Sequence, residues 1–215
     1  MYLPKQYHET RMDVLHETMR QIGAATVVAQ GRNGMIASHV PIEVDSTAGE
    51  NGTLRCHFSK ANPHVEAIAQ GGEVLVIFQG PQGYATPNWY PSKHQTGKAV
   101  PTWLYVTIHA YGPGAAYDDM DKLKRHLAAM TDHFEAPYEL PWKMDDAPDD
   151  YIASKCKGIV GIEIPIARLE GKWKMNQAKS EHDVLGVING LRAQGDENLA
   201  DLVASAYEQK QQALD

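Results

Sequence analysis

Cysteine is almost absent from this chain, with two residues in 215. Cys56 and Cys156 form no CxxC pair, so no disulfide framework is expected, and both thiols are predicted to be reduced and buried. No apolar run approaches the ~20 residues that a membrane helix requires, and the first residues lack the apolar segment of a signal peptide. These absences predict a protein of the cytoplasm with no membrane contact.

Positive charge is also scarce. The chain has 20 lysines and arginines against 27 acidic residues, a net charge of -7, which disfavours broad contact with phosphate backbones. The imbalance is strongest over residues 181–215, where seven acidic side chains stand against Arg192 and Lys210. Two helices predicted there resemble a helix-turn-helix only superficially. We therefore doubt direct DNA binding and predict that they pack on the main domain or on a partner subunit.

Several catalytic signatures are missing. The sequence has no GxGxxG, no GxxxxGK[ST], no HExxH and no GxSxG motif. Its ten histidines are scattered and show no metal-ligand spacing. No metal site is expected, and no catalytic residue is identified from motifs.

Local patterns predict short strands and a few helices. Apolar residues at helical spacing predict a helix over 12–22. Strands are predicted over 24–30, 36–44, 54–58, 73–79, 100–111 and 159–166, helices over 62–71, 120–130 and from 180 onward, and a long irregular loop over 80–98. Because strands do not alternate regularly with helices, this order favours an antiparallel barrel over a doubly wound sheet.

A first candidate binding segment is residues 57–64. Ser59, Lys60 and Asn62 follow a predicted strand and precede a helix that Asn62 can cap. Free N–H groups at a helix start attract anions, so Lys60 could hold a phosphate there. The alternative is that Asn62 is only a cap and Lys60 a solvated surface charge.

Two further segments combine aromatic and polar residues. Residues 78–105 are rich in proline and aromatics, which can enclose a planar ring while Gln79 hydrogen-bonds its edge. The same aromatics could equally pack a barrel core or a dimer interface. Residues 169–177 place Lys172 and Lys174 around Trp173, either completing an anion and ring site or forming an exposed charged loop.

Ordered blocks along the chain carry a family resemblance. They begin with MYLPK at the first residue and continue through SHVP, SKANPH, VLVIFQGP, WYPSK, VPTW, GIVGIEI and LEGKWK. Each block is modestly specific, but they are collinear over about residues 1–192. The chain resembles the PaiB family of FMN-binding negative transcriptional regulators.

The resemblance implies a mainly β fold with peripheral helices, a split β-barrel (Greek key) like that of pyridoxamine phosphate oxidases. It implies a homodimer with FMN at the subunit interface, a barrel domain over 1–179 with inserted helices, and a helical appendage over 180–215. By the same resemblance the cofactor-binding residues would be His39, Pro41, His57, Ser59, Lys60, Asn62, Gln79, Trp103, Lys174, Asn176 and Gln177.

Four positions depart from the family pattern, where polar residues are replaced by Gln82, Asn88, Leu104 and Ala178. Weaker FMN binding, or a remodelled site, is the expected result. Two other functions stay open beside an indirect regulator. One is a flavin-dependent oxidoreductase, in which His39, His57 or Tyr105 would donate protons, and the other is a non-catalytic sensor of a flavin or haem-type ligand.

Overall fold

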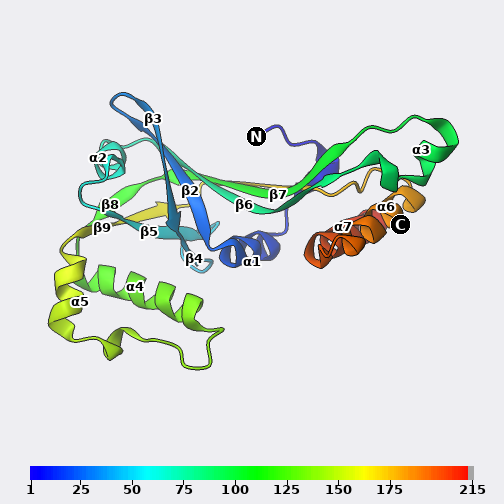
Figure 1. The fold of residues 1–215 in the computed structure, drawn as a ribbon. Coiled ribbons are helices and arrows are strands. Elements are labelled where there is room, and N and C mark those ends of the chain that lie inside the picture. The colour runs from blue at the N-terminus through cyan, green and yellow to red at the C-terminus, as the bar shows by residue number, and fades with distance from the viewer. Residues whose placement is uncertain (213–215) are drawn as a thin grey trace. The chain divides into compact units, whose positions relative to one another are not determined.

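A computed structural model describes residues 1–212, so the last three residues of the predicted C-terminal appendage lie outside the described residues. The chain, whose helices and strands are labelled in Figure 1, divides into two units. The central unit comprises Met12–Phe78 and His109–Leu169, and the terminal unit comprises Met1–Arg11, Gln79–Ile108 and the chain from Glu170 onward. The predicted domain boundary after residue 179 stays a prediction.

In the central unit, helix α1 (Met12–Ile22) leads into a tight hairpin of β2 (Ala24–Gly31) and β3 (Gly34–Pro41). Strand β6 (Glu73–Ala85) pairs with the other edge of β2 through its first half, so that Val27 lies opposite both Ser38 and Val76. All of these pairs are antiparallel. Alternate residues of β2 are buried, as a sheet with one covered face requires.

A second sheet of the central unit carries the polar residues of interest. Its order is β4 (Glu43–Asp45), β5 (Thr53–Ser59), β9 (Ile159–Pro165) and β8 (Ala115–Tyr117). Leu54, Cys56 and Phe58 of β5 are at most 2% exposed, so alternation turns Arg55, His57 and Ser59 to the other face. Helices α2 (Pro63–Ala69), α4 (Met120–Glu135) and α5 (Asp149–Cys156), with the 3-10 turn η3 (Met144–Asp146), complete this unit.

The terminal unit holds η1 (Lys5–Tyr7), β1 (His8–Glu9), η2 (Pro87–Trp89), α3 (Pro91–Thr96) and β10 (Arg168–Lys174). It also holds most of β7 (Thr102–Pro113) and the helices α6 (Glu181–Ala193) and α7 (Glu197–Gln212). Apolar residues of both helices bury Tyr90, Leu104 and Met175 in one core. The buried carboxylate of Asp183 on α6 accepts hydrogen bonds from the amide and hydroxyl of Ser92, which joins α6 to α3.

Strands β6, β7 and β10 pass from one unit into the other, and the first sheet has the order β1-β10-β7-β6-β2-β3. The predicted mainly β architecture with peripheral helices is therefore confirmed. No described helix has both the length and the apolar character needed to cross a bilayer. Both cysteines are buried free thiols, as predicted.

The predicted loop over 80–98 is wrong. Strand β6 continues to Ala85, and the short η2 and α3 follow it. Gly80 lies in β6 against Val106, where a Cβ atom would come within 3.1 Å of that side chain. Glycine has no apolar side chain, so the pattern of apolar residues that indicates a strand stops at Gly80 although the strand continues. Helix α5 and the short strands β1 and β8 were not predicted.

Two glycines of α6 allow η2 to pack against the helix. A Cβ atom at Gly186 would lie 1.9 Å from the carbonyl oxygen of Trp89, and one at Gly190 would lie 2.3 Å from its indole. Helix propensity alone predicts that Gly186→Ala stabilises the protein by about 1 kcal/mol. We expect the clash to dominate, lowering the free energy of unfolding by about 1–3 kcal/mol in urea titrations.

The matched control is Asn189→Ala, at an exposed position of the same helix. It should leave the free energy of unfolding unchanged or raise it by a few tenths of a kcal/mol. If Gly186→Ala changes the free energy of unfolding as little as this control does, that result contradicts the close approach of η2 to α6.

Candidate functional site

The end of β5 presents an exposed hydroxyl and an exposed ammonium group. Ser59 is the last residue of the strand, and Lys60 follows it. The Lys60 amide is occupied, since it donates to the Gly158 carbonyl at 3.0 Å. Its side chain, however, has no ion-pair or hydrogen-bond partner among the described residues. Lys60 is therefore available to an anion from outside the chain, and its predicted contact with a phosphate stays a prediction.

A buried histidine holds the turn after Lys60. The pKa of His64 is lowered by burial, so the ring is neutral and its Nε2–H donates to the Val27 carbonyl at 3.1 Å. Its Nδ1 then accepts from the Ser38 hydroxyl at 3.1 Å. Asn62 caps α2 through the His64 amide at 3.0 Å and donates to Ser38 at 3.3 Å. Asn62 thus fixes the turn, and its predicted contact with a cofactor stays a prediction.

His39 and Pro41 lie on β3, whose alternate residues are exposed. The Nδ1 atom of His39 is 2.9 Å from the Thr26 hydroxyl of β2, which orients the ring along the sheet. Met35, two positions before Ala37 on the same face, is 67% exposed. This face of β3 is accessible to a ligand or to another protein.

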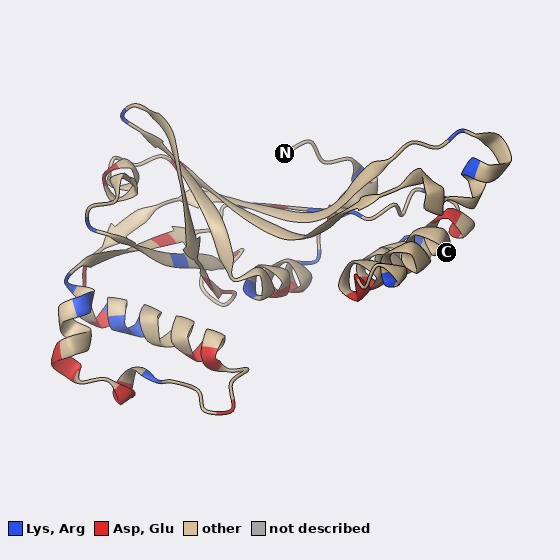
Figure 2. Ribbon diagram, in the orientation of Figure 1, with Lys and Arg blue, Asp and Glu red and all other residues tan. Residues whose placement is uncertain are grey.

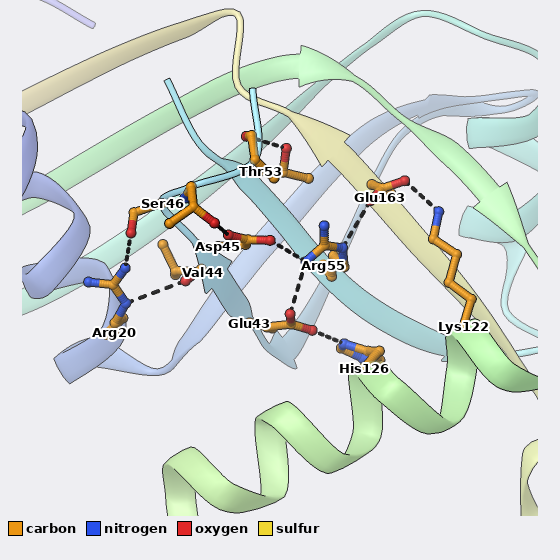
Figure 3. A network of polar contacts seen from close by, with 12 residues as sticks. Arg20, Glu43, Val44, Asp45, Ser46, Thr53, Arg55, Lys122, His126 and Glu163 are labelled. Carbon is orange, nitrogen blue, oxygen red and sulfur yellow. Dashed lines mark hydrogen bonds and ion pairs between the residues drawn. The ribbon is translucent and has the colours of Figure 1, made fainter. Parts of the chain in front are cut away.

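Beside these residues, Arg55 is the centre of a network of polar contacts (Figure 3). Its guanidinium donates to Glu43 at 3.0 Å, Asp45 at 2.9 Å and Glu163 at 2.9 Å. Lys122 of α4 donates to the second oxygen of Glu163 at 2.5 Å. The arrangement joins three strands and a helix through charge-assisted hydrogen bonds, which are about twice as strong as neutral ones.

The network shifts the protonation of its members. A hydrogen bond from the Thr47 hydroxyl, aided by Arg55, lowers the pKa of Asp45 to about 2. Burial opposes ionisation of Glu163, but hydrogen bonds from Lys122 and Arg55 outweigh it and lower its pKa. Burial likewise opposes the charge of Arg55, and its three carboxylate partners outweigh it and raise its pKa. Asp45 and Glu163 therefore remain charged through the neutral range.

The network continues into two histidines. Glu43 lies 2.6 Å from Nδ1 of His126, whose side chain is 0% exposed. The Nε2 atom of His126 lies 3.2 Å from Nδ1 of His57. A cavity of about 310 Å³ is lined by Glu43, Arg55, Lys122, Arg125, His126 and Ala129. His57 was among the predicted site residues, whereas Glu43 and His126 were not.

Predicted flavin-lining residues of the terminal unit lie on β6 and β7. Gln79 is exposed, and Trp103 is 49% exposed. The indole Nε1 of Trp103 donates to Gln82 at 3.0 Å, so the departure at position 82 supports the tryptophan. The ammonium of Lys174 lies 5.7 Å from the centre of the Tyr105 ring. These groups supply flat aromatic surfaces with polar neighbours.

Asn176 and Gln177 are buried and serve the fold. Asn176 has φ 59, in the left-handed region, and donates to the Tyr90 hydroxyl at 2.9 Å. Gln177 accepts from the Met175 amide at 2.8 Å and donates to the Trp173 carbonyl at 2.6 Å. These bonds close the chain after β10, and a cofactor contact by either residue stays a prediction. Leu104, another departure, is fully buried in the helix-packed core.

A wider cavity of about 830 Å³ lies along α1 but lacks suitable chemistry. Its charged lining is mostly acidic, with Asp13, Glu17 and Glu50 against Arg20. An anionic ligand would be repelled there, so volume alone does not identify the site. The end of β5 and the adjacent network are the better candidates.

Residues 1–168 match the model of a protein family described as "Putative FMN-binding domain". An uncharacterized protein of Emericella nidulans is 33% identical over 91% of this chain and 92% of its own length. The protein of Bacillus subtilis called "Protease synthase and sporulation protein PAI 2" is 30% identical over 92% of this chain and 91% of its own length. The predicted resemblance and the predicted FMN cofactor are confirmed by these matches.

Solved structures show the same fold. A conserved hypothetical protein of Mycobacterium tuberculosis aligns with a TM-score of 0.58 at 9% identity, covering 84% of this chain and 95% of that one. A FAD and heme binding protein of Mycobacterium smegmatis aligns with a TM-score of 0.55 at 17% identity, covering 78% and 73%. The predicted split barrel is confirmed.

Arg55→Leu should destabilise the central unit strongly, because three carboxylates lose their common cation. The Arg55 side chain is 18% exposed, so we expect a loss near the lower end of the range for broken buried pairs, about 3 kcal/mol at pH 7. Lys122→Met, which removes the second cation of Glu163 and the ammonium over the Tyr117 ring, should cost less than about 1 kcal/mol. Urea denaturation measures both.

The stability difference between wild type and Arg55→Leu should depend on pH. Because folded Asp45 and Glu163 have lowered pKa values, their stabilisation is complete above the unfolded values and is lost as pH falls. For Asp45 this loss runs from pH 3.8 down to about 2. The difference between wild type and Arg55→Leu should shrink over this interval. A difference that is constant down to pH 2 would contradict the assigned network.

Proposed function

Because the chain belongs to the family of FMN-binding domains that residues 1–168 match, we propose that it is a flavoprotein that holds the FMN phosphate at the end of β5. The observation that carries the proposal is the Lys60 ammonium, which has no partner among the described residues and follows the exposed Ser59. A cation beside a hydroxyl donor can give a phosphate charge-assisted hydrogen bonds, which are the stronger kind.

The donor set fits the cofactor. FMN combines a phosphate dianion with a hydroxylated chain and a planar ring, and the central unit offers Ser59 and Lys60 for the first of these. In the terminal unit Trp103 is exposed and Gln79 and Lys174 are polar, and the contact of these residues with the ring stays a prediction. When bound, FMN would supply hydride or single-electron transfer, while the chain's own residues bind and orient it.

We further propose that the chain acts as an indirect negative regulator of transcription. The Bacillus relative is named for protease synthesis and sporulation, which suggests a regulatory role. Residues 181–212 hold six acidic residues, and acidic positions are coloured red in Figure 2. Arg192 is already paired with Glu197 and Asp201. A duplex would meet negative charge there, so regulation would work through FMN, a metabolite or a partner protein.

A flavin-dependent oxidoreductase is the second candidate. It is favoured by His57, which lies on the same face of β5 as Ser59, with one residue between them.

A homodimer would use the exposed face of β3, where Met35, His39 and Pro41 lie. Dimerisation and a cytoplasmic location stay predictions.

Lys60→Ala should weaken FMN binding by about 10- to 100-fold, the value of one charge-assisted hydrogen bond. Quenching of flavin fluorescence on titration of the purified chain measures the dissociation constant. Lys60→Arg should restore most of the affinity, because it returns a cation. Lys124→Ala, which removes a lysine from α4, should leave the affinity unchanged. Equal affinity in Lys60→Ala and wild type would move the phosphate elsewhere.

Indirect regulation predicts weak, non-selective association with DNA. In gel-shift experiments with the upstream DNA of regulated genes, we expect no complex that survives about 0.2 M salt, whether or not FMN is present. A stable, sequence-selective complex at that salt concentration would show that the chain reads DNA itself.

A further inference from the structure

One row of titratable groups in the central unit, with His126 buried and Glu43 and His57 half-buried, has no role in binding the phosphate. The row runs from Glu43 of β4 through His126 of α4 to His57 of β5. A carboxylate oxygen of Glu43 lies 2.6 Å from Nδ1 of His126, and Nε2 of His126 lies 3.2 Å from Nδ1 of His57. The His126 side chain is 0% exposed and that of Glu43 is 15% exposed. The second oxygen of Glu43 is fixed by Arg55 at 3.0 Å. The row is thus rigid at its carboxylate end.

Hydrogen-bond chemistry permits two states of the row. The Glu43 carboxylate can only accept, so Nδ1 of His126 carries a hydrogen. In the first state His126 is neutral, and its Nε2 accepts from Nδ1–H of His57, which leaves a lone pair on Nε2 of His57. In the second state His126 is an imidazolium that donates from Nε2 to Nδ1 of His57, and the hydrogen of His57 is on its own Nε2. The two states differ by one proton.

We propose that Glu43, His126 and His57 form a proton relay that exchanges one proton with a substrate at Nε2 of His57 and stores that proton on His126. On uptake, Nε2 of His57 binds a proton and Nδ1 of His57 passes its own to Nε2 of His126. On release, both transfers reverse. No electron is moved, and the positive charge gained on uptake rests beside Glu43, which stabilises it.

In this relay His57 transfers the proton and His126 holds it. Burial, with the charge of His126 as a second cause, lowers the pKa of His57 to about 4. At neutral pH His57 is therefore uncharged and changes only its tautomer, whereas His126 faces a carboxylate. This division of roles corresponds to the way a buried carboxylate orients and charges a histidine in acid–base catalysis.

The formal charges around His126 and His57 cancel, and Glu43 is the charged group in direct contact with His126. Three carboxylates, Glu43 included, and three cations surround the two histidines, and a tyrosine from β8 completes their surroundings. These groups are Glu43 and Asp45 from β4, Arg55 from β5, Glu163 from β9, Lys122 and Arg125 from α4, and Tyr117 from β8.

The location of the relay gives it a use, and this part rests on the proposed FMN site. Side chains two residues apart on one strand face are about 7 Å apart, so His57 neighbours Ser59, a proposed phosphate ligand. An acceptor that gains a hydride also needs one proton. Nε2 of His57 would supply it, and His126 would then return a proton to Nδ1 of His57.

The test is a pH titration of the ring nitrogens by NMR, on the full chain without FMN. We expect the His57 and His126 signals to move together at one midpoint. The nitrogens of His57 should exchange between Nδ1–H and Nε2–H without the ring becoming charged. Separate midpoints, or a His57 ring that gains charge at the midpoint of His126, would overturn the relay. Exposed His94 and His182 serve as internal references.

Glu43→Gln tests the storage site, since it removes the anion and leaves Arg55 with Asp45 and Glu163. The shared midpoint should fall by about 1–3 pH units, while the signals of His94 and His182 stay in place. An unchanged midpoint would show that Glu43 does not stabilise the stored proton. If this variant does not fold, the wild-type titration still decides the proposal.

Titration with FMN separates this proposal from the binding proposal. If FMN does not bind, the apo titration still tests the relay. If FMN binds and the relay lies at its site, saturating FMN should shift the Nε2 signal of His57, and Lys60→Ala should remove the shift at the same FMN concentration. Tight binding with an unmoved His57 signal would overturn the assignment of the relay to flavin chemistry.

Discussion

The charge balance at Arg55 is the constraint on which the polar face of the central unit depends. One guanidinium bridges Glu43 and Asp45 of β4 and Glu163 of β9, three carboxylates that would otherwise repel one another. A guanidinium presents five N–H donors in a fixed planar fork, whereas the ammonium group of a lysine has three donors on one rotatable group. The position of Glu43 then fixes His126, and His126 fixes His57. The orientation of a histidine beside the proposed phosphate ligands is thus set by an arginine on the same strand.

Elements with a strong local pattern could be predicted from the sequence. The alternation of Leu54, Cys56 and Phe58 indicated both β5 and the face that Arg55, His57 and Ser59 share. Pairing at a distance left no such signal. His126 is 83 residues from Glu43 and 69 from His57 along the chain, so no spacing rule connects them. The second half of β6 was missed because Gly80 fits against Val106 by having no side chain.

At the candidate site, residue type alone does not indicate which side chains can bind a ligand and which hold the fold. Lys60 and Asn62 belong to the same motif, yet Lys60 is free toward solvent while Asn62 caps a helix and holds Ser38. Asn176 and Gln177 are amides like Gln79, but their hydrogen bonds stay within the chain. An amide can bind a ligand or close a turn with the same atoms, so only the three-dimensional partners separate these roles. The ordered blocks of sequence identified the family because they combine many such positions.

The packing of α6 and α7 has a consequence for how this chain can be divided. The match to the family model ends at residue 168, but Tyr90, Leu104 and Val106 bury their side chains against Val187, Leu191 and Val203 of those later helices. A fragment cut where the similarity stops would expose an apolar surface of the kind that drives aggregation. The segment that matches the family and the segment that must fold together therefore end at different residues. Expression of residues 1–168 alone would yield a protein without the helices that complete this core.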